Sequence, residues 1–182
     1  AWATAITSGP ANEAAQVLSF LVTGNTNPGL FTIQPSLTPD GTLTYTPAPD
    51  ANGTAVVTVV LHDDGGTANG GSDETAPQTI TFTVTPVNDV PSFTKGADQT
   101  VLEDCGPQTV SSWATGISRG PANEAAQVLT FTVTTTNDAL FAARPAVSGS
   151  TGALTYTPAP DANGTAVVTV VLHDDGGTAN GG

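Results

Sequence analysis

Apolar and polar residues alternate along several short stretches of the chain, and this two-residue period is typical of a strand with one buried face. Ile80, Phe82 and Val84 alternate with threonines and give the clearest case. The pattern predicts further strands at 18–22, 43–45, 55–62 and 129–133, and shorter ones that begin at 30 and 140 and end at Pro35 and Pro145. Residues 93–103 predict a kinked strand that 108–113 continue, whereas residues 12–16 are too short a helical stretch for more than a turn. The chain is therefore predicted to be all-β.

The chain contains a long internal repeat. Residues 43–71, LTYTPAPDANGTAVVTVVLHDDGGTANGG, return without a change at 154–182, and GPANEAAQVL at 9–18 returns at 120–129. The copies lie 111 residues apart, which is about the size of one sandwich domain. Between these two segments the copies differ and carry a compensating one-residue slip. The sequence therefore predicts tandem domains.

The segment PVNDVP at 86–91 is the predicted domain boundary. It assigns residues 1–89 to a repeat that lacks its first strand, and residues 90–182 to a repeat that lacks its last strand. An incomplete sandwich exposes unpaired backbone groups and an open core. Two explanations follow: the chain is a window on a longer tandem array, which we favour, or a neighbouring molecule supplies a strand.

Charge narrows the range of partners. Three Lys and Arg residues stand against sixteen Asp and Glu residues, which gives a net charge of −13 and a pI near 4.1. Nucleic acid is not an expected partner because phosphate binding needs basic patches, and an anionic membrane surface is disfavoured for the same reason. No apolar run is long enough to span a bilayer, so we expect no membrane insertion. Such one-sided charge favours the local binding of cations, metal ions above all.

The rare side chains give no clear catalytic signal. Cys105, the single cysteine, is predicted to be a small buried apolar residue, with a crosslink to another chain as the alternative. His62 and His173 are equivalent positions in two repeats, so they cannot share a site, and we expect surface residues. Trp2 and Trp113 are predicted to fill the core, with a sugar-stacking platform as the alternative. Because every candidate group is duplicated with the repeat, we expect no enzyme, although spacing alone leaves open a glycosidase-like pair of carboxylates.

Three motifs follow one another in this chain: YTPAPDANGTAVVTVVLHDDGG, TITFTVTPVNDVPSF and VLEDCG. In that order they resemble the cadherin-like and Ig-like tandem repeats of large bacterial surface proteins, among them the tandem-95 and VCBS-like adhesin repeats. The resemblance covers essentially the whole chain. It implies tandem Ig-like/cadherin-like Greek-key β-sandwich domains of about seven strands, secreted, extracellular or on the cell surface, and often stiffened by calcium at the junctions. The chain departs from these repeats at Cys105, where a small residue is usual, and at Asn12-Glu13 and Asn123-Glu124, which replace a more acidic loop.

Side chains with oxygen ligands gather in clusters along the chain, and Ca²⁺ takes roughly six to eight such oxygens. One predicted site joins Glu13 and Asp63 or Asp64 to the linker pair Asn88-Asp89. The other joins Glu103, Glu124 and Asp174 or Asp175. The full set of candidate ligands is Glu13, Asp63, Asp64, Asn88, Asp89, Glu103, Asp104, Glu124, Asp174 and Asp175. The alternative is that these acids are merely solvated and keep a Thr-rich β protein soluble.

The predicted function is that of a structural and adhesive repeat module of a secreted surface protein or extracellular fibre. It would provide reach and stiffness, with Ca²⁺ as its cofactor and neighbouring copies of its own repeat as partners. The alternatives are a carbohydrate- or surface-binding module, and a self-assembling filament subunit that is completed by strand donation from a neighbour.

Overall fold

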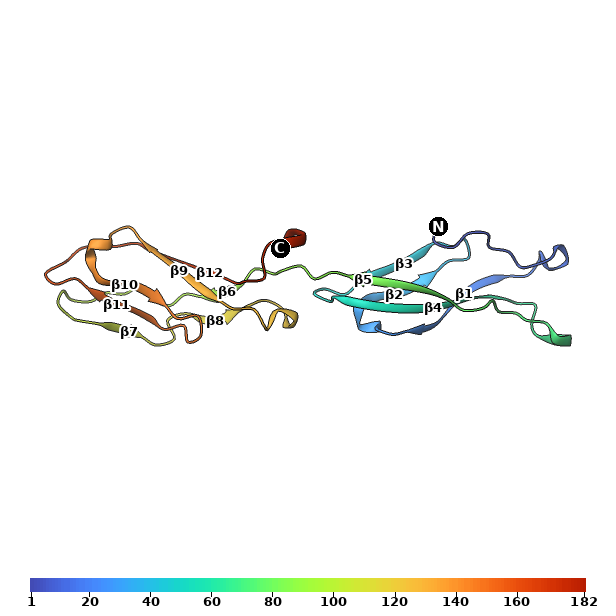
Figure 1. The fold of residues 1–182 in the computed structure, drawn as a ribbon, viewed down its shortest axis with the longest axis horizontal. Helices are drawn as coiled ribbons and strands as arrows, with labels where there is room; N and C mark the ends of the chain where they lie inside the picture. Colours follow the sequence, from blue (N-terminus) through green and yellow to red (C-terminus); the bar gives the residue numbers. More distant parts are fainter. The chain divides into compact units, whose positions relative to one another are not determined.

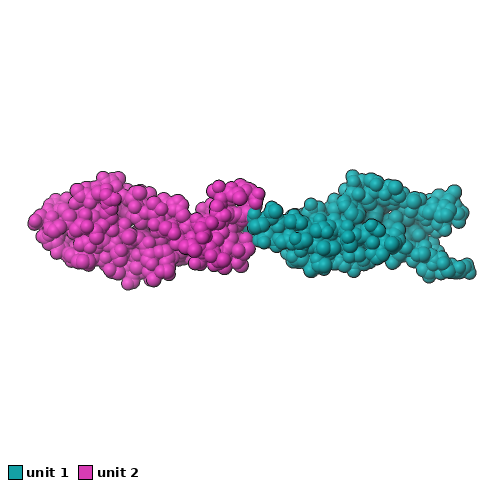
Figure 2. All heavy atoms as spheres, in the orientation of Figure 1, with its two compact units in different colours: residues 1–86 teal, residues 87–182 magenta.

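The computed structural model describes all 182 residues, and the chain is all-β, as predicted. It divides into two compact units, residues 1–86 and 87–182, which Figure 1 shows as ribbons and Figure 2 in two colours. Each unit consists of short antiparallel strands in small sheets, which is consistent with a β-sandwich. The helical segments are 3-10 turns of three residues, and none of the chain's helices has the length and apolarity that a membrane crossing needs.

Unit 1 holds a three-stranded and a two-stranded sheet. The strands are β1 (Leu18–Asn25), β2 (Phe31–Leu37), β3 (Leu43–Pro47), β4 (Gly53–Asp63) and β5 (Gln78–Val84), with 3-10 turns at Ala11–Glu13, Pro28–Leu30 and Ala68–Gly70. In the first sheet β4 lies between β1 and β5, and in the second β2 pairs with β3. Residues of both sheets form one core, in which Leu30, Val57 and Val59 are the largest fully buried side chains.

Unit 2 holds one three-stranded sheet and two pairs of strands. The strands are β6 (Ser92–Thr94), β7 (Gln108–Val110), β8 (Thr115–Ser118), β9 (Thr130–Thr135), β10 (Phe141–Val147), β11 (Leu154–Pro158) and β12 (Val168–His173), with 3-10 turns at Ala122–Glu124, Asp138–Leu140 and Ala179–Gly181. β11 lies between β10 and β7, while β12 pairs with β9 and β6 with β8. Its buried core residues are Ala114, Val147, Leu154 and Tyr156.

The identical sequences of β4 and β12 do not form identical strands. β4 runs over the whole of Gly53–Asp63 because it pairs with β5 along one edge and with β1 along the other. Its copy is a strand only at Val168–His173, since unit 2 has no strand equivalent to β5. Val57, which lies opposite Ile80 of β5, is accordingly fully buried, whereas its copy Val168 is only half-buried. The neighbouring strand, rather than the local sequence, decides both length and burial.

For the repeated strands β3 and β11, the copy in unit 2 is the more buried one. β11 pairs with β7 through Leu154 and Tyr156, and Tyr156 is only 8% exposed. Unit 1 has no equivalent of β6 or β7, so β3 has one uncovered edge and Tyr45 is 45% exposed. Each unit therefore lacks a strand that the other unit contains.

The one-residue slip between the repeats lies in a bulge and a turn. In unit 1 the register of β1 against β4 shifts between Val22 and Gly24, whereas β9 pairs with β12 without a shift. The extra residue of unit 1 is therefore a β-bulge, which accommodates one residue without losing the rest of the ladder. Unit 2 regains the residue in the turn after β10, at 148–153, which corresponds to 38–42 after β2.

Several predictions at the level of single segments were wrong. β2 and β10 do not end at their prolines but continue to Leu37 and Val147; Pro35 is tolerated because the ladder is already irregular between Ile33 and Ser36. The strand expected at 93–103 is reduced to β6. Cys105 is exposed rather than buried, because it lies in the turn before β7 between Asp104 and Gly106, both of which have positive φ angles.

Candidate functional site

The linker pair Asn88-Asp89 is attached to one end of unit 2. The backbone N–H of Asp89 donates to Glu124 Oε1 at 2.7 Å. The Asn88 side chain donates to Asp174 Oδ1 at 3.0 Å and accepts from Gln127 Nε2 at 2.6 Å. These five residues, Asn88, Asp89, Glu124, Gln127 and Asp174, form what we call the polar cluster of unit 2. The predicted boundary at residue 89 thus lies inside a hydrogen-bonded group, and the compact unit begins at Val87.

Glu124 is the most unusual member of the polar cluster. It is only 4% exposed and is the one buried charged residue of the chain. Its second carboxylate oxygen, Oε2, is buried and has no hydrogen-bond partner. A Cβ atom at Gly120 would lie 2.1 Å from this oxygen and 3.2 Å from Asp89 Cβ, so only glycine fits between the two groups. A buried carboxylate oxygen without a partner is costly unless a cation or a proton meets it.

The two aspartates after β12 hold the neighbouring loops. Asp174 Oδ1 accepts from the backbone N–H of Gly176 at 2.9 Å as well as from Asn88, and Asp175 Oδ1 accepts from Val128 N–H at 2.8 Å. The repeated Asp-Asp-Gly-Gly motif therefore has a local structural role, because its second aspartate bonds the end of β12 to the segment before β9. Asp174 also brings a carboxylate to the polar cluster.

Unit 1 has the same framework without the linker pair. Asp64 Oδ1 accepts from Val17 N–H at 2.8 Å and Asp63 Oδ1 from Gly65 N–H at 2.8 Å, as their copies do in unit 2. Glu13, the copy of Glu124, is only half-buried. The structure pairs Asn88-Asp89 with Glu124 and Asp174, which differs from the expected grouping with Glu13 and Asp63. The linker pair accounts for the deeper burial of Glu124.

Glu103 and Asp104 do not join the polar cluster. Asp104 Oδ1 accepts from the backbone N–H of Asp161 at 3.0 Å, and Glu103 accepts from the Asn163 side chain at 3.4 Å. Their partners lie in the turn before β12, whereas Asp174 follows the end of β12. Because a strand rises about 3.3 Å per residue, β12 separates the two groups. The grouping of Glu103 with Glu124 and Asp174 is therefore not found.

The polar cluster offers oxygen ligands but no ready-made metal cage. No three His, Cys, Asp or Glu side chains converge in a geometry that would hold a metal ion. The cluster does supply two carboxylates, Glu124 and Asp174, an amide oxygen from Asn88, and Asp89 at the surface. The one nearby cationic side chain, Arg119, donates to the backbone carbonyl of Gln127 and not to a carboxylate. The hard oxygen donors, with one buried oxygen unpaired, fit Ca²⁺ better than a softer metal.

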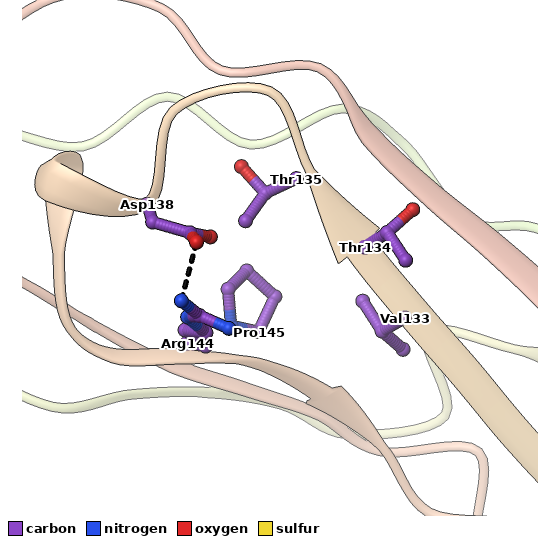
Figure 3. Close-up of a pocket in the computed structure, with 6 residues that line it drawn as sticks. All are labelled: Val133, Thr134, Thr135, Asp138, Arg144 and Pro145. Atoms are coloured by element: carbon purple, nitrogen blue, oxygen red, sulfur yellow. Dashed lines mark hydrogen bonds and ion pairs between the residues drawn. The ribbon is translucent and has the colours of Figure 1, made fainter.

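A hollow lies between β9 and β10 (Figure 3). It is lined by Val133, Thr134, Thr135, Asp138, Arg144 and Pro145. Asp138 forms an ion pair with Arg144 across it, as the dashed line in Figure 3 shows. The pair is exposed, so it is a surface ion pair whose net contribution to stability is small.

Sequence reasoning missed Gln127. Its side chain holds Asn88, and its Oε1 is buried without a partner, like that of its copy Gln16. The signal was present, because both glutamines belong to the unchanged segment GPANEAAQVL, but an amide in a repeat has no distinctive chemistry by itself.

The tryptophans differ between the units. Trp113 packs against the core of unit 2, and its indole N–H donates to Ala97 O at 2.9 Å. Trp2 is 43% exposed, because residues 1–86 contain no counterpart of the segment that carries Ala97.

No family model, curated protein or solved structure matches the chain.

Proposed function

We propose that the chain is a structural and adhesive repeat module of a secreted surface protein or extracellular fibre, built of Ig-like/cadherin-like Greek-key sandwiches. The observation that carries this proposal is that the same polar framework recurs in both units. Val17 with Asp64 and Val128 with Asp175 form identical 2.8 Å bonds. A repeated framework suits a body that is duplicated for length, whereas catalysis needs one gathered set of groups.

Ca²⁺ is the proposed cofactor, and the polar cluster of unit 2 is its proposed site. Glu124, Asp174 and the Asn88 amide would hold the ion, with Glu124 Oε2 as the oxygen that has no other partner. Bound Ca²⁺ would neutralise these carboxylates in a chain of net charge −13. Because Asn88 and Asp89 are linker residues, an ion there would fix the linker onto unit 2 and stiffen the junction.

Calcium is expected to raise the melting temperature of unit 2. An affinity of about 10⁻⁴–10⁻³ M suits an extracellular module, so 10 mM Ca²⁺ should add about 1.4–2.7 kcal/mol and shift Tm by roughly 5–15 °C relative to EDTA. Fluorescence in a Trp2→Phe background reports unit 2 alone, because Trp113 is then the only tryptophan. Glu124→Gln should abolish the shift, whereas the matched Glu13→Gln should leave it intact. Superimposable melting curves in Ca²⁺ and in EDTA would show that unit 2 binds no Ca²⁺, which contradicts this part of the proposal.

A glycan array separates the structural module from the carbohydrate-binding alternative. We expect no ligand, because the indole of Trp113 is committed to the core and to Ala97. Binding that is lost on Trp113→Ala or on the matched Trp2→Ala would instead support a carbohydrate-binding module.

A further inference from the structure

Two outer strands of the repeat are present in both units: β1 with its copy β9, and β2 with its copy β10. β1 pairs only with β4, and β9 pairs only with β12. Unit 1 includes β5 and unit 2 includes β6, β7 and β8, yet none of these strands covers β1 or β9. The outer position therefore belongs to the repeat itself. We call the uncovered side of β9 the β9 edge.

The backbone groups on the β9 edge follow from the pairing of β9 with β12. The N–H of Thr136, just after β9, donates to Val167 O at 3.0 Å. Alternate residues of an antiparallel strand direct their N–H and C=O groups to opposite sides. Phe131, Val133 and Thr135 therefore direct theirs away from β12, and no other strand lies on that side. The β9 edge thus presents three residues whose backbone groups can enter a further ladder.

β9 has none of the features that protect the other outer strands. Proline, charged side chains and bulges all discourage the addition of another strand. Pro35 and Pro145 lie in β2 and β10, whose registers are also irregular, and β1 has a bulge between Val22 and Gly24. β9, with the sequence TFTVTT, is uncharged and pairs with β12 in an unbroken register. Among these four strands, β9 is the one best suited to accept another strand.

The charges beside the β9 edge are self-complementary. Asp138 and Arg144 are the only charged residues between Glu124 and Asp161, so this stretch is neutral in a chain of net charge −13. They form an exposed ion pair in the hollow that Val133 also lines (Figure 3). Two copies can meet along this side without the repulsion that the acidic parts of the surface would cause. Each copy offers one cation and one carboxylate to the other, which favours a second copy as the partner.

We propose that the β9 edges of two copies of this chain pair in an antiparallel ladder across a two-fold axis, which joins their two β9–β12 sheets into one. The axis passes beside Val133, the middle one of the three outward-facing residues. Val133 then pairs with Val133 of the second copy, and Phe131 with Thr135. Such a two-fold contact uses the same surface on both copies. On the exposed face the register places Thr132 opposite Thr134 of the second copy, a cross-strand pair that favours the ladder.

Amide hydrogen exchange at increasing chain concentration, in EDTA, tests the proposal. Between about 10 µM and about 1 mM of the 182-residue chain, exchange at Phe131, Val133 and Thr135 should slow by about fivefold or more, because these amides enter the new ladder. Exchange at Thr132 and Thr134 should change less, since their backbone groups already face β12. Exchange in β1 should not change, because its bulge interrupts the edge.

Charge variants test the partner. Arg144→Asp should weaken association by about tenfold or more in sedimentation velocity, because each copy then presents two carboxylates at the contact. The fold should be kept, because the ion pair is exposed. The exchanged variant Asp138→Arg/Arg144→Asp should restore association to within about threefold, since its charges are again self-complementary. Lys95→Asp is the matched control: Lys95 also forms an exposed ion pair in unit 2 but lies outside the β9 edge.

Three results would overturn the proposal. The first is a chain that stays monomeric over the whole concentration range. The second is equal weakening of association by Arg144→Asp and Lys95→Asp. The third is association that slows exchange in another strand but not at Phe131, Val133 and Thr135, which would show that copies meet elsewhere. Because EDTA is present throughout, none of these results depends on the proposed calcium site.

Discussion

Phe82→Ala is expected to lower the free energy of unfolding of unit 1 by about 3–5 kcal/mol, the usual cost of truncating a buried phenylalanine. Phe82 is 7% exposed, and its ring contacts Phe31 and Tyr45 edge to face. Each such aromatic pair contributes about 0.5–1.5 kcal/mol of stability beyond the contribution of the buried apolar area. Because a small domain has only about 5–15 kcal/mol of stability, this single change removes a large share.

The measurement is hydrogen exchange of the β4 amides, which report the opening of unit 1. Thr83→Ala is the matched control, because Thr83 is exposed on the other face of β5, and it should cost under about 1 kcal/mol. Exchange in β9 and β12 of unit 2 should not change with either variant. If the two substitutions cost the same, β5 is not the strand that completes the core of unit 1.

The strands of this chain could be predicted because alternation is a local signal. The alternation of Ile80, Phe82 and Val84 with threonines was enough to predict a strand without knowing which strands lie beside it. The structure has this strand as β5, over Gln78–Val84. The lengths of β4 and β12 could not be predicted, because their sequences are identical and their difference comes from a strand distant in sequence.

The members of the polar cluster other than Gln127 were predictable, but their grouping was not. Glu124, Asp174, Asn88 and Asp89 were all candidate ligands on the grounds of side-chain chemistry. The linker pair could have joined either repeat, because Glu13 and Asp63 stand in the first repeat where Glu124 and Asp174 stand in the second. Only the folded chain shows that Asn88 and Asp89 bond to the second set.

Tyr156→Ala is expected to destabilise unit 2 by about 3 kcal/mol, near the lower end of the cost for a buried aromatic residue. The same substitution at Tyr45 should cost unit 1 about 1–2 kcal/mol, because the residue is 45% exposed but keeps its ring contacts with Phe31 and Phe82. Denaturant unfolding followed by amide exchange in each unit gives both values. Both tyrosines lie in the same LTYTP sequence, so any difference must come from their surroundings: β7 covers only Tyr156, and Phe82 of β5 contacts only Tyr45.

The conservative variant Tyr156→Phe separates packing from the hydroxyl group. The Tyr156 hydroxyl is buried without a hydrogen-bond partner, so its removal should be neutral or slightly stabilising. Burial, and secondly the charge of Cys105, raise the pKa of Tyr156 above its ordinary value of 10.0. The folded unit therefore favours the protonated phenol: its stability is fully present below pH 10 and falls as the pH rises through the folded-state pKa. Tyr156→Phe should remove this alkaline loss, and a loss of several kcal/mol at neutral pH instead would show that the hydroxyl group has a partner.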